Sequence, residues 1–179
     1  MSHNEYESQY EAGASPRSRG GAVTHDPARD ALARRIATVV AATFALVGIL
    51  GFIPGITQNF DEIEFAGHES NAELFGIFEV SILHNIVHLL FGLVGFVLAR
   101  RADTARAYLI GGGVVYLLLW IYGLVIDHDS DANFIPVNDA DNWLHFALGA
   151  GMIVLGLLTL PRRRERDTAT RMRPRPGPA

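Results

Sequence analysis

Two histidines four residues apart stand in an apolar stretch with few other polar groups. His84 and His88 have the spacing that lets two imidazoles on one helix reach the same metal ion. His145 in a second apolar stretch could add a third ligand, and Asp141, one turn before it, a carboxylate. This set would suit Zn or Fe, and His88 with His145 could instead ligate a haem from two sides. Because polar groups are costly in apolar segments, these residues are the first place to look for chemistry.

The same residues admit two further interpretations. In the one we favour, the polar side chains hydrogen-bond one another between helices and fix the helix register, each bond contributing about 0.6–2 kcal/mol. In the other, histidines that change charge line a pathway for a substrate, a proton or a quinone. The candidate polar set is Ser81, His84, Asn85, His88, Asp141, Asn142 and His145. No catalytic residue is assigned and no cofactor is identified, and we favour a non-enzymatic role.

The elements that carry these residues are predicted to be membrane helices. Hydrophobic residues make up 49% of the 179-residue chain. No Lys or Arg occurs between Arg35 and Arg100, or between Arg106 and Arg162. The sequence therefore predicts an all-α, integral membrane four-helix bundle within residues 32–160. The spans are expected at about 34–53, 72–99, 107–126 and 140–160, and the polar segments 1–31 and 161–179 are expected to be disordered cytoplasmic tails.

The arginines predict the orientation of this bundle. Both tails and the short loop 100–106 are basic, whereas the longer loops 54–71 and 127–139 contain acidic residues and no Arg or Lys. The positive-inside rule then places both termini in the cytoplasm and both acidic loops outside. Every basic residue is Arg, as in proteins from GC-rich bacterial genomes, so we expect a bacterial plasma membrane. The expected partners are the lipid bilayer and either a second copy of the chain or another membrane protein, with no nucleic acid.

The chain lacks two residue types that carry much of protein chemistry. It contains no Cys, which excludes disulfides, thiolate metal sites and Cys nucleophiles. It also contains no Lys, which excludes a Schiff-base lysine.

A short polar pattern occurs twice, in the second and the fourth predicted span. The shared skeleton is Asn-x-x-His-x-x-x-Gly, formed by Asn85, His88 and Gly92 in one copy and by Asn142, His145 and Gly149 in the other. At 100° per residue, the three residues of each copy share one helix face. Each copy follows an acidic loop and runs from outside to inside, which predicts a parallel 2+2 internal repeat. Any chemistry should lie between these two spans, in the outer half of the membrane.

Four segments taken together resemble one known family. They are Gly51–Thr57, Glu79–Gly92, Tyr116–Gly123 and Ala132–His145. Over about residues 34–160 the chain resembles the bacterial four-span membrane family catalogued as domain of unknown function 4383. That resemblance implies a four-span fold and no established activity. The four-span plan is more distantly similar to DoxX-type membrane proteins, some of which are linked to quinone or thiol redox work.

These observations predict a small integral membrane protein with an Asn/His polar core that acts as a structural or partner-binding subunit. The alternative is a redox protein linked to a metal, a haem or a quinone through the histidines of the second and fourth spans. A further alternative is a subunit of a small-molecule transporter.

Overall fold

The computed structural model describes residues 26–130 and 132–161. Within them lie four α-helices: α2 (Pro27–Leu50), α3 (Ile82–Leu98), α4 (Ala102–Val125) and α5 (Asp139–Leu158). Helices α2, α4 and α5 are long and apolar enough to cross a membrane, whereas α3 is apolar but has only 17 residues. The prediction of a helical protein with membrane-like helices is thus confirmed. Most of the two predicted tails, residues 1–25 and 162–179, lies outside the described residues.

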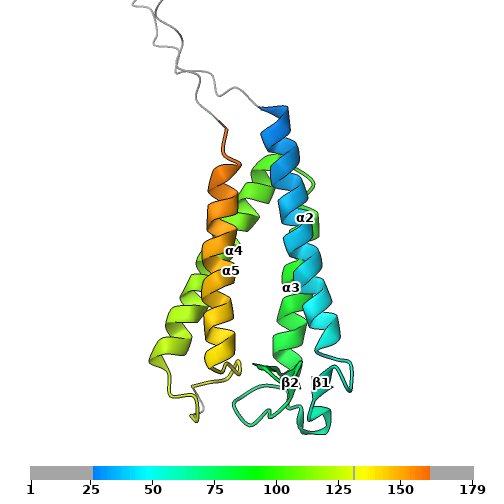
Figure 1. Cartoon of the computed structure of the whole chain (residues 1–179), viewed down its shortest axis with the longest axis vertical. Coiled ribbons are helices and arrows are strands. Elements are labelled where there is room, and N and C mark those ends of the chain that lie inside the picture. The colour runs from blue at the N-terminus through cyan, green and yellow to red at the C-terminus, as the bar shows by residue number, and fades with distance from the viewer. Residues whose placement is uncertain (1–25, 131, 162–179) are drawn as a thin grey trace, which may run out of the picture. The chain divides into compact units, whose positions relative to one another are not determined.

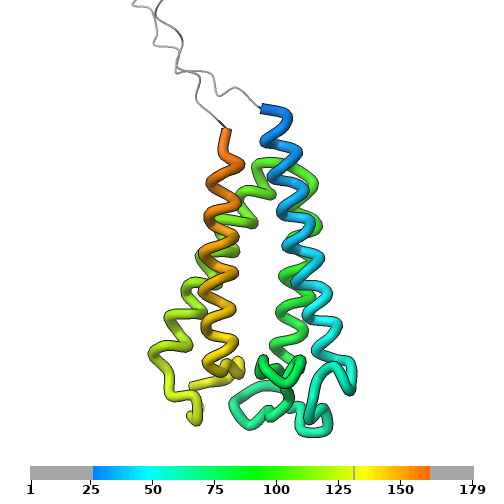
Figure 2. The backbone as a smooth tube through the Cα atoms, in the orientation of Figure 1, coloured from blue at the N-terminus to red at the C-terminus, as the bar shows by residue number. Residues whose placement is uncertain are grey.

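The four helices pack as two antiparallel pairs, α2 beside α3 and α4 beside α5 (Figure 1). Contacts within each pair far outnumber those between the pairs. The start of α2 and the end of α5 lie at one end of this bundle, which we call the terminal end, and the long connections lie at the other, the loop end (Figure 2). Large apolar side chains such as Leu93, Leu118 and Val125 point outward and are 59%, 60% and 78% exposed. An apolar outer surface of this kind is suited to lipid.

Helix α2 begins at Pro27 rather than at Arg34, so residues 27–31, which were expected in the tail, are helical. The Asp26 carboxylate accepts hydrogen bonds from the backbone N–H groups of Ala28, at 3.0 Å, and Arg29. Proline at the first helical position has the right φ and gives up a donor that would have no partner. Capping therefore starts the helix well before the apolar segment begins.

Residues 72–81, predicted as the start of the second span, belong instead to a small antiparallel sheet at the loop end. Its strands are β1 (Thr57–Gln58), β2 (Glu73–Leu74) and β3 (Phe78–Glu79), in the order β1-β2-β3, and a short 3-10 turn covers Phe60–Glu62. Phe75 and Gly76 turn the chain between β2 and β3 with φ of 58° and 68°, which a helix cannot include. Helix α3 starts only after Ser81, whose Oγ accepts the backbone N–H of His84 at 3.1 Å.

Helix α4 begins at Ala102, so residues 102–106 are helical and not a loop as predicted. Their charges lower the hydropathy, but a helix can continue beyond its apolar segment. At the terminal end Arg106 is buried, with 4% of its surface exposed. Its guanidinium donates to the Thr159 carbonyl at 2.8 Å and to the carboxylates of Asp30 at 2.5 Å and Asp103 at 3.2 Å. One side chain of α4 thereby binds the start of α2 and the end of α5.

Candidate functional site

The three predicted histidines converge on one cavity at the loop end, between the two helix pairs. We call it the histidine cavity; its volume is about 80 Å³. Its polar lining consists of His84 and His88 from α3, Tyr116 from α4, and Asp141 and His145 from α5. The remaining walls are apolar: Val47, Leu74, Phe75, Phe78, Val80, Leu144 and Leu148. The polar groups therefore meet in a small space with mainly hydrophobic walls.

The imidazole rings contact one another and an aromatic layer. The ring centroids of His84 and His88 are 4.5 Å apart, and those of His84 and His145 are 6.5 Å apart. His88 packs edge-on against Phe44 at 5.6 Å, and His145 against Tyr116 at 5.3 Å. Phe44 and Tyr116 are themselves in contact at 5.1 Å. His88 and His145 are thus each in contact with one ring of the Phe44–Tyr116 pair.

Each of these histidines has a buried nitrogen without a hydrogen-bond partner among the described residues. The atoms are Nδ1 of His84, His88 and His145. An unmade hydrogen bond of a buried polar group costs about 1–3 kcal/mol, so three of them are a large burden for a marginally stable fold. Buried polar groups in native proteins nearly always have partners. The arrangement is therefore suited to a molecule that hydrogen-bonds to the imidazoles.

Of the other four polar residues predicted for the core, three bind backbone groups, whereas Asn142 has no side-chain hydrogen bond among the described residues and its Oδ1 is buried without a partner. Ser81 caps α3, and Asn85 donates its amide N–H to the Gly51 carbonyl at 2.9 Å. The Asp141 carboxylate accepts the backbone N–H groups of Glu79 at 2.9 Å and Asn138 at 3.2 Å. Among the described residues, no hydrogen bond joins two side chains of the predicted set. Ser81, Asn85 and Asp141 thus fix helix ends and the loop-end hairpin, which differs from the predicted network of side chains bonding to each other.

The two helix pairs make matching contacts at their polar ends. The Asn85 amide packs so closely on Gly51 that a Cβ there would collide with it, and the Asn142 amide packs in the same way on Gly123. From α3 to α5 the matched residues are offset by 57 positions, as from Asn85 to Asn142, and from α2 to α4 by 72, as from Gly51 to Gly123.

The same offsets recur deeper in each pair. The ring contacts Phe44–His88 and Tyr116–His145 follow them. Gly92 lies against Ala41 and Ala45, and Gly149 lies against Gly113 and Leu117. Four pairs of contacts therefore correspond from one helix pair to the other.

Two of the sequence-based interpretations find no support in this geometry. In the described part of the chain, no group of three or more His, Cys, Asp or Glu side chains has an arrangement that could hold a metal ion. A cavity of about 80 Å³ is also far smaller than the roughly 300–1,000 Å³ of sites for drug-sized ligands, so a haem does not fit.

The sequence did not single out Tyr116 or the hairpin residues as parts of the site. Tyr116 is 3% exposed, and its ring contacts both His145 and Phe44. The available signal was its position 72 residues after Phe44, the same offset that separates Gly123 from Gly51. Phe75 lines the cavity from the turn between β2 and β3 and is 52% exposed. Because residues 72–81 were predicted as part of a helix, nothing in the sequence indicated that Phe75 lies at a hairpin turn beside the cavity.

Glu79 takes no part in the histidine cavity. It lines a separate, polar cavity of about 410 Å³ between the loops, together with His68 and His128. Burial raises the pKa of the Glu79 carboxyl, and the nearby Glu73 carboxylate raises it further. Its side chain thus lies among the polar groups of the loop end, outside the histidine cavity.

Asp141 should hold the loop end together. Replacing it by alanine removes its half of the α5 capping box, which is the bond from the Asn138 backbone N–H, and the bond from the backbone N–H of Glu79 in β3. We expect the free energy of unfolding to fall by about 2–4 kcal/mol. Urea or SDS titration of the purified protein, followed by circular dichroism, measures this change. The control is Asp139→Ala, an exposed acid in the same helical turn, with an expected loss of about 0.3–1 kcal/mol. Equal losses in both variants would contradict the role given to Asp141.

Comparison with known proteins gives one finding about the chain. The family model described as a domain of unknown function (DUF4383) matches residues 34–158. No curated protein and no solved structure matches the chain.

Proposed function

Because the chain belongs to the family of the domain of unknown function 4383, as its sequence predicted, and the family brings no activity with it, we propose a function from the site itself. The protein is a membrane-embedded binding protein that holds a small hydrogen-bonding molecule in the histidine cavity. The observation that carries this proposal is the set of three buried Nδ1 atoms without partners around one cavity. A single water needs roughly 10–15 Å³, so about 80 Å³ admits several waters or one molecule of a few non-hydrogen atoms.

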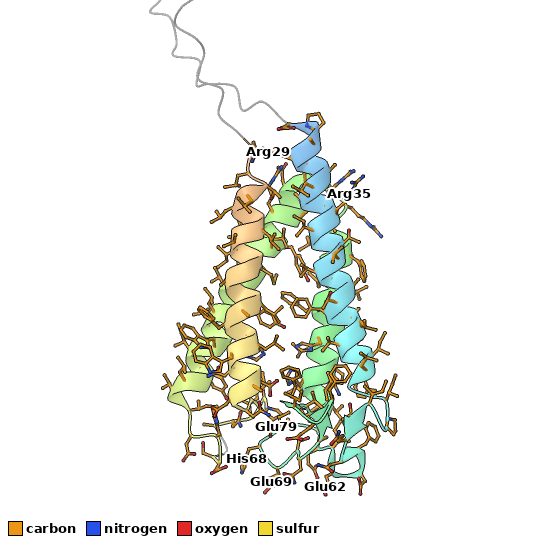
Figure 3. All side chains as sticks on the ribbon, in the orientation of Figure 1. Arg29, Arg35, Glu62, His68, Glu69 and Glu79 are labelled. Atoms are coloured by element: carbon orange, nitrogen blue, oxygen red, sulfur yellow. The ribbon has the colours of Figure 1, made fainter. Side chains whose placement is uncertain are left out.

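The proposed setting is a bacterial plasma membrane crossed by all four helices, with both termini in the cytoplasm. Arginines gather at the terminal end and acidic residues at the loop end, as Arg29 and Arg35 against Glu62 and Glu69 illustrate (Figure 3). Helix α3 is short, but apolar side chains such as Leu90 (54% exposed) lie on its outer face. This orientation puts the histidine cavity in the outer half of the membrane.

The two helix pairs are proposed to be copies of one repeat. The contacts described above support this, since they keep constant offsets on both the first and the second helix of each pair. The repeat places one histidine from each copy, His88 and His145, at the same cavity. A site built from both copies can bind one molecule at their interface.

The second candidate function is a structural or partner-binding subunit whose histidines only stabilise the bundle. The backbone hydrogen bonds of Asn85 and Asp141 favour it, because those side chains hold helix ends in place. The two candidates differ in what the histidines do to stability.

Replacing His88 and His145 by leucine distinguishes the two candidates. A binding site keeps unpartnered polar groups at the expense of stability. We therefore expect His88→Leu/His145→Leu to raise the free energy of unfolding of the purified protein by about 1–2 kcal/mol, since leucine removes two buried nitrogens without partners. A structural role predicts a loss of similar size. SDS titration followed by circular dichroism gives the sign directly.

The control for this pair is His68→Leu, a half-buried residue of the loop end outside the histidine cavity, with an expected change within about 0.5 kcal/mol. A lower stability of the double variant would sink the binding proposal. Absorption spectra and metal analysis of the wild-type protein test the redox alternative, for which a Soret band or stoichiometric metal lost in His88→Ala is required.

A further inference from the structure

A groove runs over the surface at the terminal end of the α2–α3 pair. Its volume is about 830 Å³, and we call it the arginine groove. Helix α2 contributes Ala31, Arg34, Arg35, Thr38 and Val39, and the end of α3 with the residues after it contributes Phe96, Ala99 and Arg100. Three arginines therefore surround a groove in which every other residue except Thr38 is apolar.

The three guanidinium groups have no counter-charge in the described part of the chain. Arg34, Arg35 and Arg100 are exposed, and neither an ion pair nor a side-chain hydrogen bond is found for them there. The neighbouring cations differ: Arg29 pairs with Asp26 at 3.6 Å, and Arg106 pairs with Asp30. The arginine groove thus keeps its positive charge available to an external anion.

Charged and apolar residues occupy different parts of the arginine groove. Arg34 and Arg35 lie on α2 toward the terminal end, and Val39 lies about one turn further into the bundle. Phe96 likewise lies one turn before Arg100 along the other side. Val39 and Phe96 are 64% and 39% exposed, so an apolar surface continues from the arginines toward the hydrocarbon region. A ligand that matches both parts has an anionic head and a hydrocarbon chain.

We propose that the arginine groove binds an anionic phospholipid of the cytoplasmic leaflet. The phosphate lies among Arg34, Arg35 and Arg100, and an acyl chain follows Val39 and Phe96. Basic pockets between membrane helices on the cytoplasmic side recognise such headgroups by this charge complementarity. The inference needs the proposed membrane orientation but is independent of the histidine cavity, with which the groove shares no residue.

Native mass spectrometry of the full chain with added phosphatidylglycerol, phosphatidylcholine or inorganic phosphate tests the proposal. We expect phosphatidylglycerol to bind, and each of Arg35→Gln and Arg100→Gln to weaken its binding about fivefold. Arg101→Gln, which removes the same charge from an exposed residue outside the arginine groove, is the matched control and should change binding less than about twofold. Phosphatidylcholine and inorganic phosphate should bind weakly.

A groove-filling variant tests the apolar part while every arginine stays in place. Val39→Trp should weaken phosphatidylglycerol binding at least as much as the arginine variants, whereas Val115→Trp, on the exposed surface of α4, should leave it unchanged. Two results would overturn the proposal. One is binding that falls equally in Arg35→Gln and Arg101→Gln; the other is inorganic phosphate that competes with the lipid at equal concentration, which would mark a simple phosphate site.

Discussion

Replacing Arg106 by methionine should lower the free energy of unfolding by about 3 kcal/mol or more. The side chain is buried, and its guanidinium donates to the Thr159 carbonyl and to the Asp30 carboxylate. Methionine keeps most of the volume but removes every donor. The Asp30 carboxylate and the Thr159 carbonyl then lose the guanidinium as a hydrogen-bond donor where α2, α4 and α5 meet. Losses of this size are typical when one member of a buried ion pair is removed.

The matched control for this prediction is Arg101→Met. It removes the same charge five positions earlier in the chain, where the side chain is exposed and forms no cap hydrogen bond. We expect a change within about 0.5 kcal/mol. Arg106→Lys should lie between the two, since an ammonium group cannot donate in the planar fork geometry that serves three acceptors. SDS titration of all three variants gives the comparison, and an Arg106→Met protein as stable as Arg101→Met would rule out the role assigned to Arg106.

Leucine at Gly92 should separate α2 from α3. A Cβ at Gly92 would lie 2.8 Å from the backbone oxygen of Ala41 and 2.8 Å from the backbone nitrogen of Ala45. These are backbone atoms of the facing helix, so no side-chain rotation relieves the clash. We expect a loss of about 3 kcal/mol or more, at the upper end of overpacking effects. Gly149→Leu should behave similarly, because its Cβ would lie 2.9 Å from the backbone oxygen of Gly113.

Gly111→Leu is the control for both glycine variants. Nothing lies within 4 Å of a Cβ at Gly111, and its helix face is exposed. The same change in hydropathy therefore occurs without a clash, and we expect the stability to stay within about 0.5 kcal/mol. Thermal unfolding in detergent, read by circular dichroism, orders the three variants. A Gly92→Leu protein as stable as Gly111→Leu would show that α2 and α3 do not pack closely at Gly92.

Much of the helical architecture could be predicted from the distribution of charge and hydropathy. Helix α5 falls within two residues of its predicted bounds, because Asn138 and Asp141 form a capping box at one end and the apolar pattern stops at the other. Membership of the family could also be predicted from the sequence, and the match of the family model over residues 34–158 confirms it.

The start of α3 could not be predicted, because hydropathy does not distinguish an apolar hairpin from a helix. Leu74, Phe78 and Val80 continue the apolar run of α3 into the hairpin. Local geometry prevents α3 from starting earlier in the chain. Phe75 and Gly76 have positive φ, and Ser81 caps the first turn of the helix. A single aromatic residue with positive φ is too unusual to expect from sequence alone.

Four of the polar residues that line the histidine cavity, His84, His88, Asp141 and His145, stand in the predicted set, but their bonding and the other walls of the cavity could not be predicted. The repeated Asn and His indicated one face on each of two helices, and the histidines of both faces, His88 and His145, line one cavity. The partner of each polar group depends on distances between helices that periodicity does not determine. Asn85 thus meets a backbone carbonyl, while the Nδ1 atoms of His88 and His145 meet no partner among the described residues.

The short α3 has a consequence for the thickness of the surrounding bilayer. With 24 residues α2 rises about 36 Å, whereas the 17 residues of α3 rise about 26 Å, less than the roughly 30 Å of a typical hydrocarbon core. In the proposed arrangement the hairpin that extends α3 also walls the histidine cavity through Phe75 and Phe78. A thicker bilayer would press lipid tails against this polar backbone, at a cost of a fraction of a kcal/mol per ångström of mismatch. In the proposed arrangement, the short α3 therefore matches a thin membrane region better than a thick one.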